Sequence, residues 1–163
     1  MKNIKNLFVI GLGLVVISVS CKKKEDTPAP SASKTELLCN KTYTMKALTA
    51  NPGVNMGTGT PVTDLFSYIP ACSKDDKITF KTTGKVTTDE GASKCTATDP
   101  QSYDEDWKFT TNESIIELTD KDGKKKNYTV ITIDGTTFKT SYVEDDSSTT
   151  PPTKRTYTVT MQK

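Results

Sequence analysis

Apolar and polar residues alternate along most of the chain beyond residue 40, and this period of two predicts β-strands with one buried face. In the segment 77–82, Ile78 and Phe80 share a face, as do Trp107 and Phe109 in 106–110. Stretches rich in Gly, Asn, Asp and Pro separate such segments and predict turns. The eight predicted strands span residues 41–50, 77–82, 85–89, 106–110, 114–119, 126–133, 136–144 and 155–161.

Turn residues connect these strands in sequence order. Thr83-Gly84 predicts a hairpin between the second and third strands, and Asp134-Gly135 predicts a type I′ hairpin, in which both central residues have positive φ. A short helical piece is expected at 63–69, where three apolar residues share a face at helical spacing. These three residues are Leu65, Phe66 and Ile69.

Eight consecutive strands with short links predict an all-β domain. An eight-stranded antiparallel up-and-down barrel is favoured, because closure pairs every strand and leaves no edge. A two-sheet β-sandwich is the alternative. The 29 threonines agree with half-buried strands, and the lack of long crossover segments argues against an α/β fold.

The first 20 residues have the pattern of a bacterial lipoprotein signal peptide. Lys2 and Lys5 precede an apolar run at 7–19, which is shorter than the roughly 20 residues that a membrane-spanning helix needs. A small residue, Ser20, then precedes Cys21, and this arrangement resembles a lipobox. We expect cleavage before Cys21 and lipidation of its thiol; a secreted soluble protein and a retained membrane helix are the alternatives.

Residues 21–36 are charged and then rich in Pro, Ala and Ser, which predicts a flexible tether. Lys24-Glu25-Asp26 resembles the export signal that takes lipoproteins of Bacteroidetes-type bacteria to the outer face of the outer membrane, although a solvated charge run explains it equally well. The expected organisation is therefore a signal peptide at 1–20, a lipid-anchored tether at 21–36 and a β-barrel domain at 37–163.

The net charge and the residue types of the chain exclude several classes of function. Removal of Lys2 and Lys5 with the signal peptide leaves equal numbers of basic and acidic residues, so nucleic acid is not an expected partner. The chain has no histidine, which excludes the usual catalytic triads and the commonest metal ligand. We therefore expect no enzyme activity, no cofactor and no metal.

The acidic motifs have simpler explanations than catalysis or metal binding. Asp75-Asp76 and Asp104-Glu105-Asp106 are read as solvated charges at turns or strand ends, since adjacent acids in a strand point to opposite faces. Asp120-Lys121-Asp122-Gly123 resembles the start of a calcium loop but lacks the later ligands, so we expect a hairpin turn there.

The cysteines predict one disulfide in an oxidising compartment. With Cys21 assigned to lipid, three cysteines remain. Cys72 and Cys95 flank the predicted hairpin 77–89 at its open end and form the preferred pair, which leaves Cys39 as a free thiol under the first strand. Pairing of Cys39 with either of the other two remains the alternative.

Several motifs together resemble the lipocalin-like domains of Bacteroidetes-type envelope lipoproteins over residues 37–163. They are the Cys-x-x-Asp-Asp-x-apolar-x-Phe string at 72–80, the second cysteine at Cys95 and the Trp107-Lys108-Phe109 strand. Tyr43 stands where that family usually has tryptophan, and Cys39 is not part of its pattern. The resemblance implies a small eight-stranded calyx on a lipid anchor, in a family with no settled common ligand.

Two functions follow from such a barrel. It either binds a small apolar or amphipathic ligand at the bacterial envelope, or it is a structural or protein-interaction module whose interior is filled by side chains. Binding is the favoured hypothesis, for a monomer held on the outer membrane through Cys21. The residues expected to line the cavity are Tyr43, Phe80, Trp107, Phe109, Tyr128, Phe138 and Tyr157.

Overall fold

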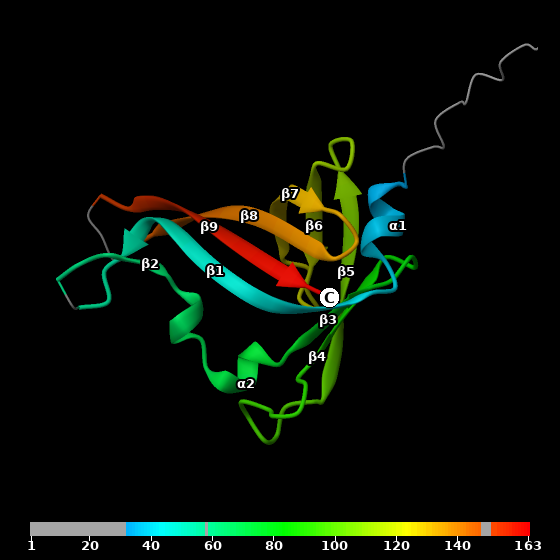
Figure 1. Cartoon of the computed structure of the whole chain (residues 1–163), viewed down its shortest axis with the longest axis horizontal. Coiled ribbons are helices and arrows are strands. Elements are labelled where there is room, and N and C mark those ends of the chain that lie inside the picture. The colour runs from blue at the N-terminus through cyan, green and yellow to red at the C-terminus, as the bar shows by residue number, and fades with distance from the viewer. Residues whose placement is uncertain (1–31, 58, 148–150) are drawn as a thin grey trace, which may run out of the picture. The chain divides into compact units, whose positions relative to one another are not determined.

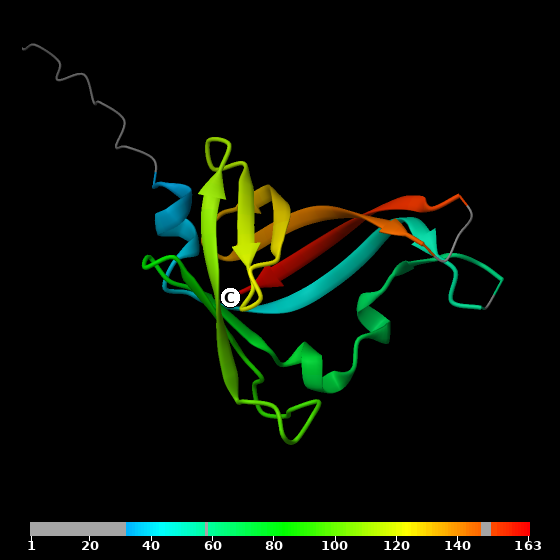
Figure 2. The ribbon, with the colours of Figure 1, turned by 180° about the vertical axis from the view of Figure 1, so that it is seen from behind.

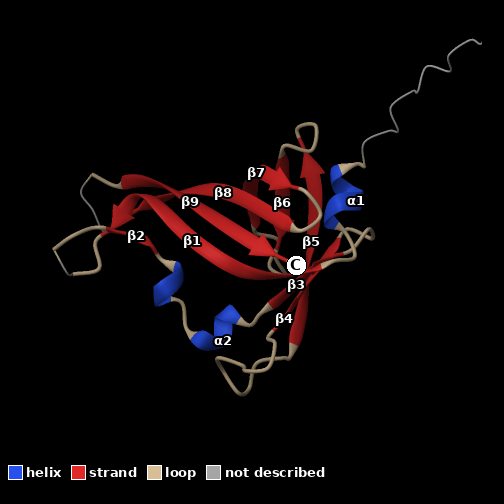
Figure 3. Cartoon of the chain, in the orientation of Figure 1, coloured by secondary structure: helices blue, strands red, loops and turns tan. Residues whose placement is uncertain are grey.

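The computed structural model describes residues 32–57, 59–147 and 151–163, which form nine strands and three short helical turns. Figure 3 shows that strands make up most of the domain, with the helical pieces outside the sheet. In chain order the elements are α1 (Lys34–Leu38), β1 (Thr42–Val54), β2 (Val62–Asp64), η1 (Phe66–Tyr68), α2 (Ala71–Lys74), β3 (Lys77–Phe80), β4 (Lys85–Asp89), β5 (Ser102–Thr110), β6 (Ile115–Thr119), β7 (Lys125–Ile133), β8 (Thr137–Asp146) and β9 (Thr153–Gln162).

Eight of these strands form a closed antiparallel barrel with sequential neighbours. The order runs from β1 through β3 to β9, and β9 pairs with β1 along most of its length, from Thr44↔Gln162 to Asn51↔Thr156. β1 and β3 share only the register pairs Thr42↔Thr79 and Tyr43↔Ile78, so these two strands separate soon after they meet. β1, β8 and β9 continue as a long ribbon to which β2 is added (Figure 1). The predicted up-and-down barrel is confirmed.

The region between β1 and β3 differs from the predicted helix at 63–69. Val62–Asp64 is a strand paired with β1, and only Phe66–Tyr68 forms a 3₁₀ turn. The Asp64 carboxylate accepts a hydrogen bond from the Phe66 amide at 3.0 Å, and the Leu65 amide donates to the Leu48 carbonyl at 2.9 Å. The bond to Leu48 and the pairing of β2 with β1 fasten the segment to β1, and this tertiary pairing overrides the helical spacing of its apolar residues.

The Asp134-Gly135 hairpin is not the type I′ turn that the dipeptide predicted. Gly135 has a φ of +86°, but Asp134 is not among the residues with positive φ. Its carboxylate instead accepts the amides of Thr136 at 2.8 Å and Thr137 at 2.7 Å, an Asx-type turn. The Thr83-Gly84 hairpin is present as predicted, with Gly84 at a φ of +81°.

Helix α1 begins at Lys34, inside the segment 21–36 that the sequence analysis assigned to the tether. Ser33 and Glu36 form a capping box in which each side chain bonds the other residue's backbone amide. The Lys34 ammonium donates to the Glu113 carbonyl at 2.8 Å, at the β5–β6 turn. Figures 1 and 2 show α1 beside the end of β5, so the helix lies against this end of the barrel.

The end of the barrel next to α1 is filled by side chains. Leu38 and Tyr43 are fully buried, and the Tyr43 hydroxyl donates to the Leu37 carbonyl at 3.1 Å. Cys39 is a buried free thiol in the same cluster, and burial raises its pKa. The remaining buried members are Phe80, Val86, Trp107, Ile116, Phe138 and Met161. This packed layer forms the hydrophobic core of a domain with few apolar residues.

A disulfide links Cys72 of α2 to Cys95 in the loop after β4, as predicted, with a Cα–Cα distance of 5.2 Å. Cross-linking at a sequence separation of 23 stabilises a fold by about 3 kcal/mol in the chain-entropy model. The Asp75 carboxylate accepts the amides of Ala92 at 2.8 Å and Ser93 at 3.0 Å. The disulfide and these bonds together hold the 90–101 loop against α2.

Among the described residues, none of the helices is long and apolar enough to cross a membrane. The predicted signal peptide at 1–20, the lipidation site Cys21 and the Lys24-Glu25-Asp26 motif lie outside the described residues.

Candidate functional site

A pocket of about 250 Å³ lies inside the barrel, above the packed layer at the α1 end. Its floor is made of Phe80, Ile116, Phe138 and Met161, which are themselves members of the core. Its walls come from β1 and β3 to β9, since one or more inward residues of each contribute. The wall residues are Met45, Leu48, Ile78, Val86, Thr88, Glu105, Leu118, Tyr128, Thr140, Tyr142 and Val159. The site is thus mainly apolar, with a few polar groups, which is typical of small-molecule pockets.

The structure places the seven aromatic residues expected to line a cavity in three different surroundings. Phe80, Tyr128 and Phe138 are part of the pocket lining. Tyr43, Trp107 and Phe109 lie in or against the packed cluster, where the Trp107 ring contacts Phe80 and Phe109 edge to face. Tyr157 lies on β9 and stacks on Tyr142, with ring centroids 5.1 Å apart.

Sequence reasoning missed two important wall residues, Glu105 and Tyr142. Tyr142 could have been found from its parity with Phe138 on the same strand. Glu105 has the same parity as Trp107, so the period of two also places it inside. The prediction of a solvated charge for Glu105 follows from a predicted strand start at residue 106, whereas β5 begins at Ser102 and includes this residue.

The three acidic residues of β5 separate by face, as their adjacency predicted, but they lie within the strand and not at its end. Asp104 and Asp106 point outward and form salt bridges with Lys81 at 3.7 Å and Lys85 at 2.5 Å. Glu105 points inward and lines the pocket. One carboxylate of this run therefore belongs to the interior.

Three tyrosines from adjacent strands form a connected aromatic layer. Tyr128 of β7 meets the Tyr142 ring edge to face at 5.3 Å, and Tyr142 stacks on Tyr157 at 14° between the ring planes. Ala50 of β1 pairs with Tyr157 and is buried, so a small residue lies opposite the large ring. Two rings of this layer, those of Tyr128 and Tyr142, form part of the pocket wall.

A charged group adjoins the aromatic layer on the side away from the packed floor. The Lys126 ammonium lies 3.8 Å from the centre of the Tyr142 ring and 5.6 Å from that of Tyr128. It also forms a salt bridge of 2.5 Å with Glu144 on β8. A smaller adjoining hollow is lined by Glu105, Asp120, Lys124 and Lys126, among others. The interior therefore changes from apolar to charged toward this side.

Burial raises the pKa of Tyr128 to about 12, with further contributions from Tyr142, Glu105 and Glu144. Burial also raises the pKa of Tyr142 to about 12, helped by Glu144 and Tyr157. Both hydroxyls are therefore uncharged at neutral pH, and they can donate or accept hydrogen bonds in the pocket.

These two pKa values predict a loss of stability in alkali. Tyrosine in the unfolded chain ionises near pH 10, whereas the folded protein keeps both protons up to about pH 12, so the unfolded state binds fewer protons in between. The free energy of unfolding should fall as the pH rises through this window. Denaturation curves at several pH values measure the slope, which should be shallower in Tyr142→Phe and unchanged in the control Tyr68→Phe, since Tyr68 is exposed. Equal slopes in all three proteins would contradict this assignment.

The other acidic motifs lie in turns or beside the α2 helix. The 120–123 segment is a hairpin turn, as predicted: the Asp120 carboxylate accepts the amides of Asp122 at 2.9 Å and Lys124 at 2.8 Å. Asp76 is partly buried, and burial together with Glu90, Asp75 and Asp89 raises its pKa. No group of three or more metal-ligating side chains is close enough to hold an ion within the described ranges.

The closed barrel with an apolar internal pocket is compatible with a lipocalin-like fold and with ligand binding. No protein-family model, curated protein or solved structure matches this chain.

Proposed function

We propose that this protein is a lipid-anchored, lipocalin-like envelope protein that binds a small apolar or amphipathic ligand inside its barrel. The observation that carries the proposal is the pocket of about 250 Å³ above a packed floor. This volume lies just below the range of roughly 300–1,000 Å³ that is common for ligand sites, so the ligand must be small. Its apolar part would lie on Phe138 and Val159, and its polar end near Tyr128 and Glu105.

The anchoring part of the proposal rests on the sequence. Residues 1–20 would be removed as a signal peptide, and lipid on Cys21 would hold the monomeric barrel on the bacterial outer membrane, either inside the envelope or at the cell surface. The proposal includes no catalytic role and no nucleic-acid partner. Replacement of Cys21 by Ala should leave an uncut precursor. A normally processed protein with an unmodified N-terminus elsewhere would contradict the anchor alone.

The filled-barrel alternative is favoured by a different observation. Tyr43, Trp107 and Phe138 pack tightly at the α1 end, so the cavity occupies only part of the interior. An envelope interaction module with no ligand needs no more than this packed core.

Binding is tested with the intact protein purified from its native membrane. Mass spectrometry of the extract should reveal a co-purifying small molecule, and an apolar competitor should displace it. Trp107 provides a second signal, since its ring contacts Phe80 on the pocket floor at 5.2 Å between centroids. Saturable changes in its emission support the carrier function, whereas no response to a broad panel of small amphiphiles would favour the interaction module.

A further inference from the structure

Glu105 is a carboxylate in a mainly apolar pocket. It lies on the inward face of β5 opposite Val86, and it is the one acidic residue in the pocket lining. Its two sequence neighbours are both in salt bridges on the outer face, but no salt bridge among the described residues includes Glu105. Lys124 and Lys126 line the smaller adjoining hollow together with Glu105, but neither forms a salt bridge with it among the described residues. A carboxylate beside an apolar cavity that lacks such a partner favours a ligand that brings a positive charge.

The protein's own lysine shows that a cation fits against the aromatic wall. The Lys126 ammonium lies 3.8 Å from the Tyr142 ring centre and 5.6 Å from that of Tyr128, while Glu144 neutralises it from the next strand. Aromatic faces together with a carboxylate form the usual environment for ammonium recognition. Tyr128 also lines the pocket on the same side as Glu105, and the charge of Glu105 contributes to the raised pKa of this tyrosine.

We propose that the ligand of this pocket is a small cationic amphiphile, with its amine or quaternary ammonium group between Glu105 and the Tyr128 ring and its apolar part on the pocket floor. The inference rests on the proposed ligand-binding function and names the ligand class.

An anionic amphiphile fits this arrangement less well. Lys126 is the positive group on the aromatic wall, but its charge is already compensated by Glu144 at 2.5 Å. An anionic head group in the pocket would also lie beside the Glu105 carboxylate, which has no salt-bridge partner among the described residues, and neighbouring like charges repel. Fatty-acid-like ligands are therefore disfavoured relative to amines of the same length.

The experiment compares head groups on one apolar chain. The mature wild-type protein is titrated at low salt with octylamine, octyltrimethylammonium, 1-octanol and octanoate, below their micelle concentrations, with calorimetry and Trp107 emission as readouts. The cationic probes should bind at least about tenfold more tightly than octanoate, with octanol between them. This comparison needs no variant, so it does not depend on the folding of any mutant.

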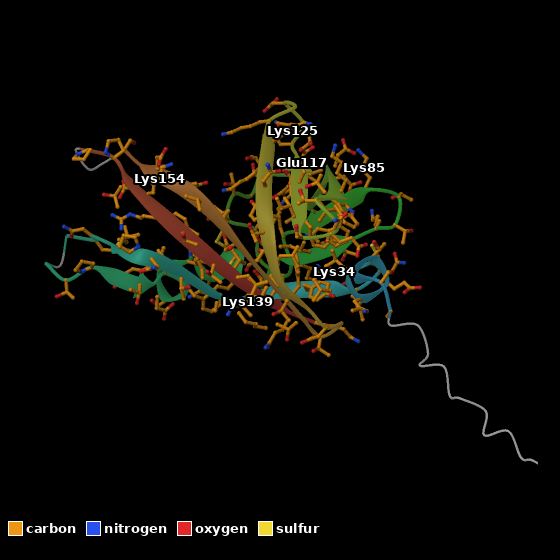
Figure 4. All side chains as sticks on the ribbon, turned by 90° about the horizontal axis from the view of Figure 1, so that it is seen from above. Lys34, Lys85, Glu117, Lys125, Lys139 and Lys154 are labelled. Carbon is orange, nitrogen blue, oxygen red and sulfur yellow. A yellow bond between two sulfur atoms is a disulfide. The ribbon has the colours of Figure 1, made fainter. Side chains whose placement is uncertain are left out.

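Two pairs of variants then locate the head group. Glu105→Gln should weaken the cationic probes by about tenfold and leave octanol unchanged, whereas Asp106→Asn, on the outer face of the same strand, should change neither. Lys126→Gln should strengthen the cationic probes, because it removes the competing positive charge. Its matched control is Lys125→Gln on the outer face, where Lys125 pairs with Glu117 at 3.0 Å (Figure 4).

The outcomes separate the two proposals. Equal binding of all four probes, tighter binding of octanoate, or equal effects of Glu105→Gln and Asp106→Asn would overturn the cationic assignment while ligand binding stands. Failure of every probe to bind the wild-type protein would overturn the ligand-binding function and this inference with it.

Discussion

Replacement of Trp107 by Ala should lower the free energy of unfolding by about 3–5 kcal/mol, the range for loss of a large buried aromatic side chain. The ring is 7% exposed and meets Phe80 and Phe109 edge to face at 5.2 and 5.3 Å. Its indole nitrogen also donates to the Lys81 carbonyl at 3.0 Å, which ties β5 to the β3–β4 turn. The change would thus open a cavity in the packed floor and remove a hydrogen bond.

Chemical denaturation followed by circular dichroism measures this effect without relying on tryptophan emission. Trp107→Phe keeps most of the ring contacts but loses the donor to Lys81, so its cost should be smaller, about 1–2 kcal/mol. Tyr103→Ala on the same strand is the surface control, because Tyr103 is 46% exposed. A loss below about 1 kcal/mol for Trp107→Ala would mean that the ring is not part of the core.

The barrel could be predicted from the sequence because each strand repeats one simple pattern. A period of two and short links determine that consecutive strands pair in order, and closure follows from the need to remove edges. The prediction that Phe80, Trp107 and Phe138 face inward is confirmed for the same reason. The predicted disulfide is confirmed, because the hairpin brings together the two segments that flank it.

The depth of each aromatic residue in the barrel could not be read from alternation. The period of two separates inside from outside, but it does not say which inward residues touch a void and which touch other side chains. That distinction depends on the register of the strands. The register shifts at two irregularities, one between Met45 and Ala47 on β1 and one between Val130 and Thr132 on β7. Such bulges leave no clear sequence signal here.

The start of α1 and the inward position of Glu105 both have signals in the sequence. Ser33-Lys34-Thr35-Glu36 has the capping-box spacing that starts α1. The parity of Glu105 with Trp107 places it inside the barrel, although a charged residue between two others usually indicates a surface position. The prediction of a type I′ turn at Asp134-Gly135 is wrong for a different reason. The Asp134 side chain accepts hydrogen bonds from two backbone amides, and these bonds stabilise another turn.

Arg155, the chain's one arginine, is buried on β9 at the far end of the ribbon formed by β1, β8 and β9. Its guanidinium donates to the Asp146 carboxylate through Nε and Nη2, both at 2.9 Å. Through Nη1 it donates to the Pro52 carbonyl at 2.9 Å and also to the Gly53 carbonyl. One planar side chain therefore joins all three strands where β1 begins to pair with β2.

Replacement of Arg155 by Ala should cost about 3–5 kcal/mol of unfolding free energy, because it removes one partner of a buried ion pair and the donor to two backbone carbonyls. Arg155→Lys should recover only part of this loss, since an ammonium cannot reproduce the planar fork. Lys154→Ala is the matched control, for Lys154 is the exposed neighbour on the same strand (Figure 4). If Arg155→Ala and Lys154→Ala unfold at the same denaturant concentration, the guanidinium does not hold the ribbon together.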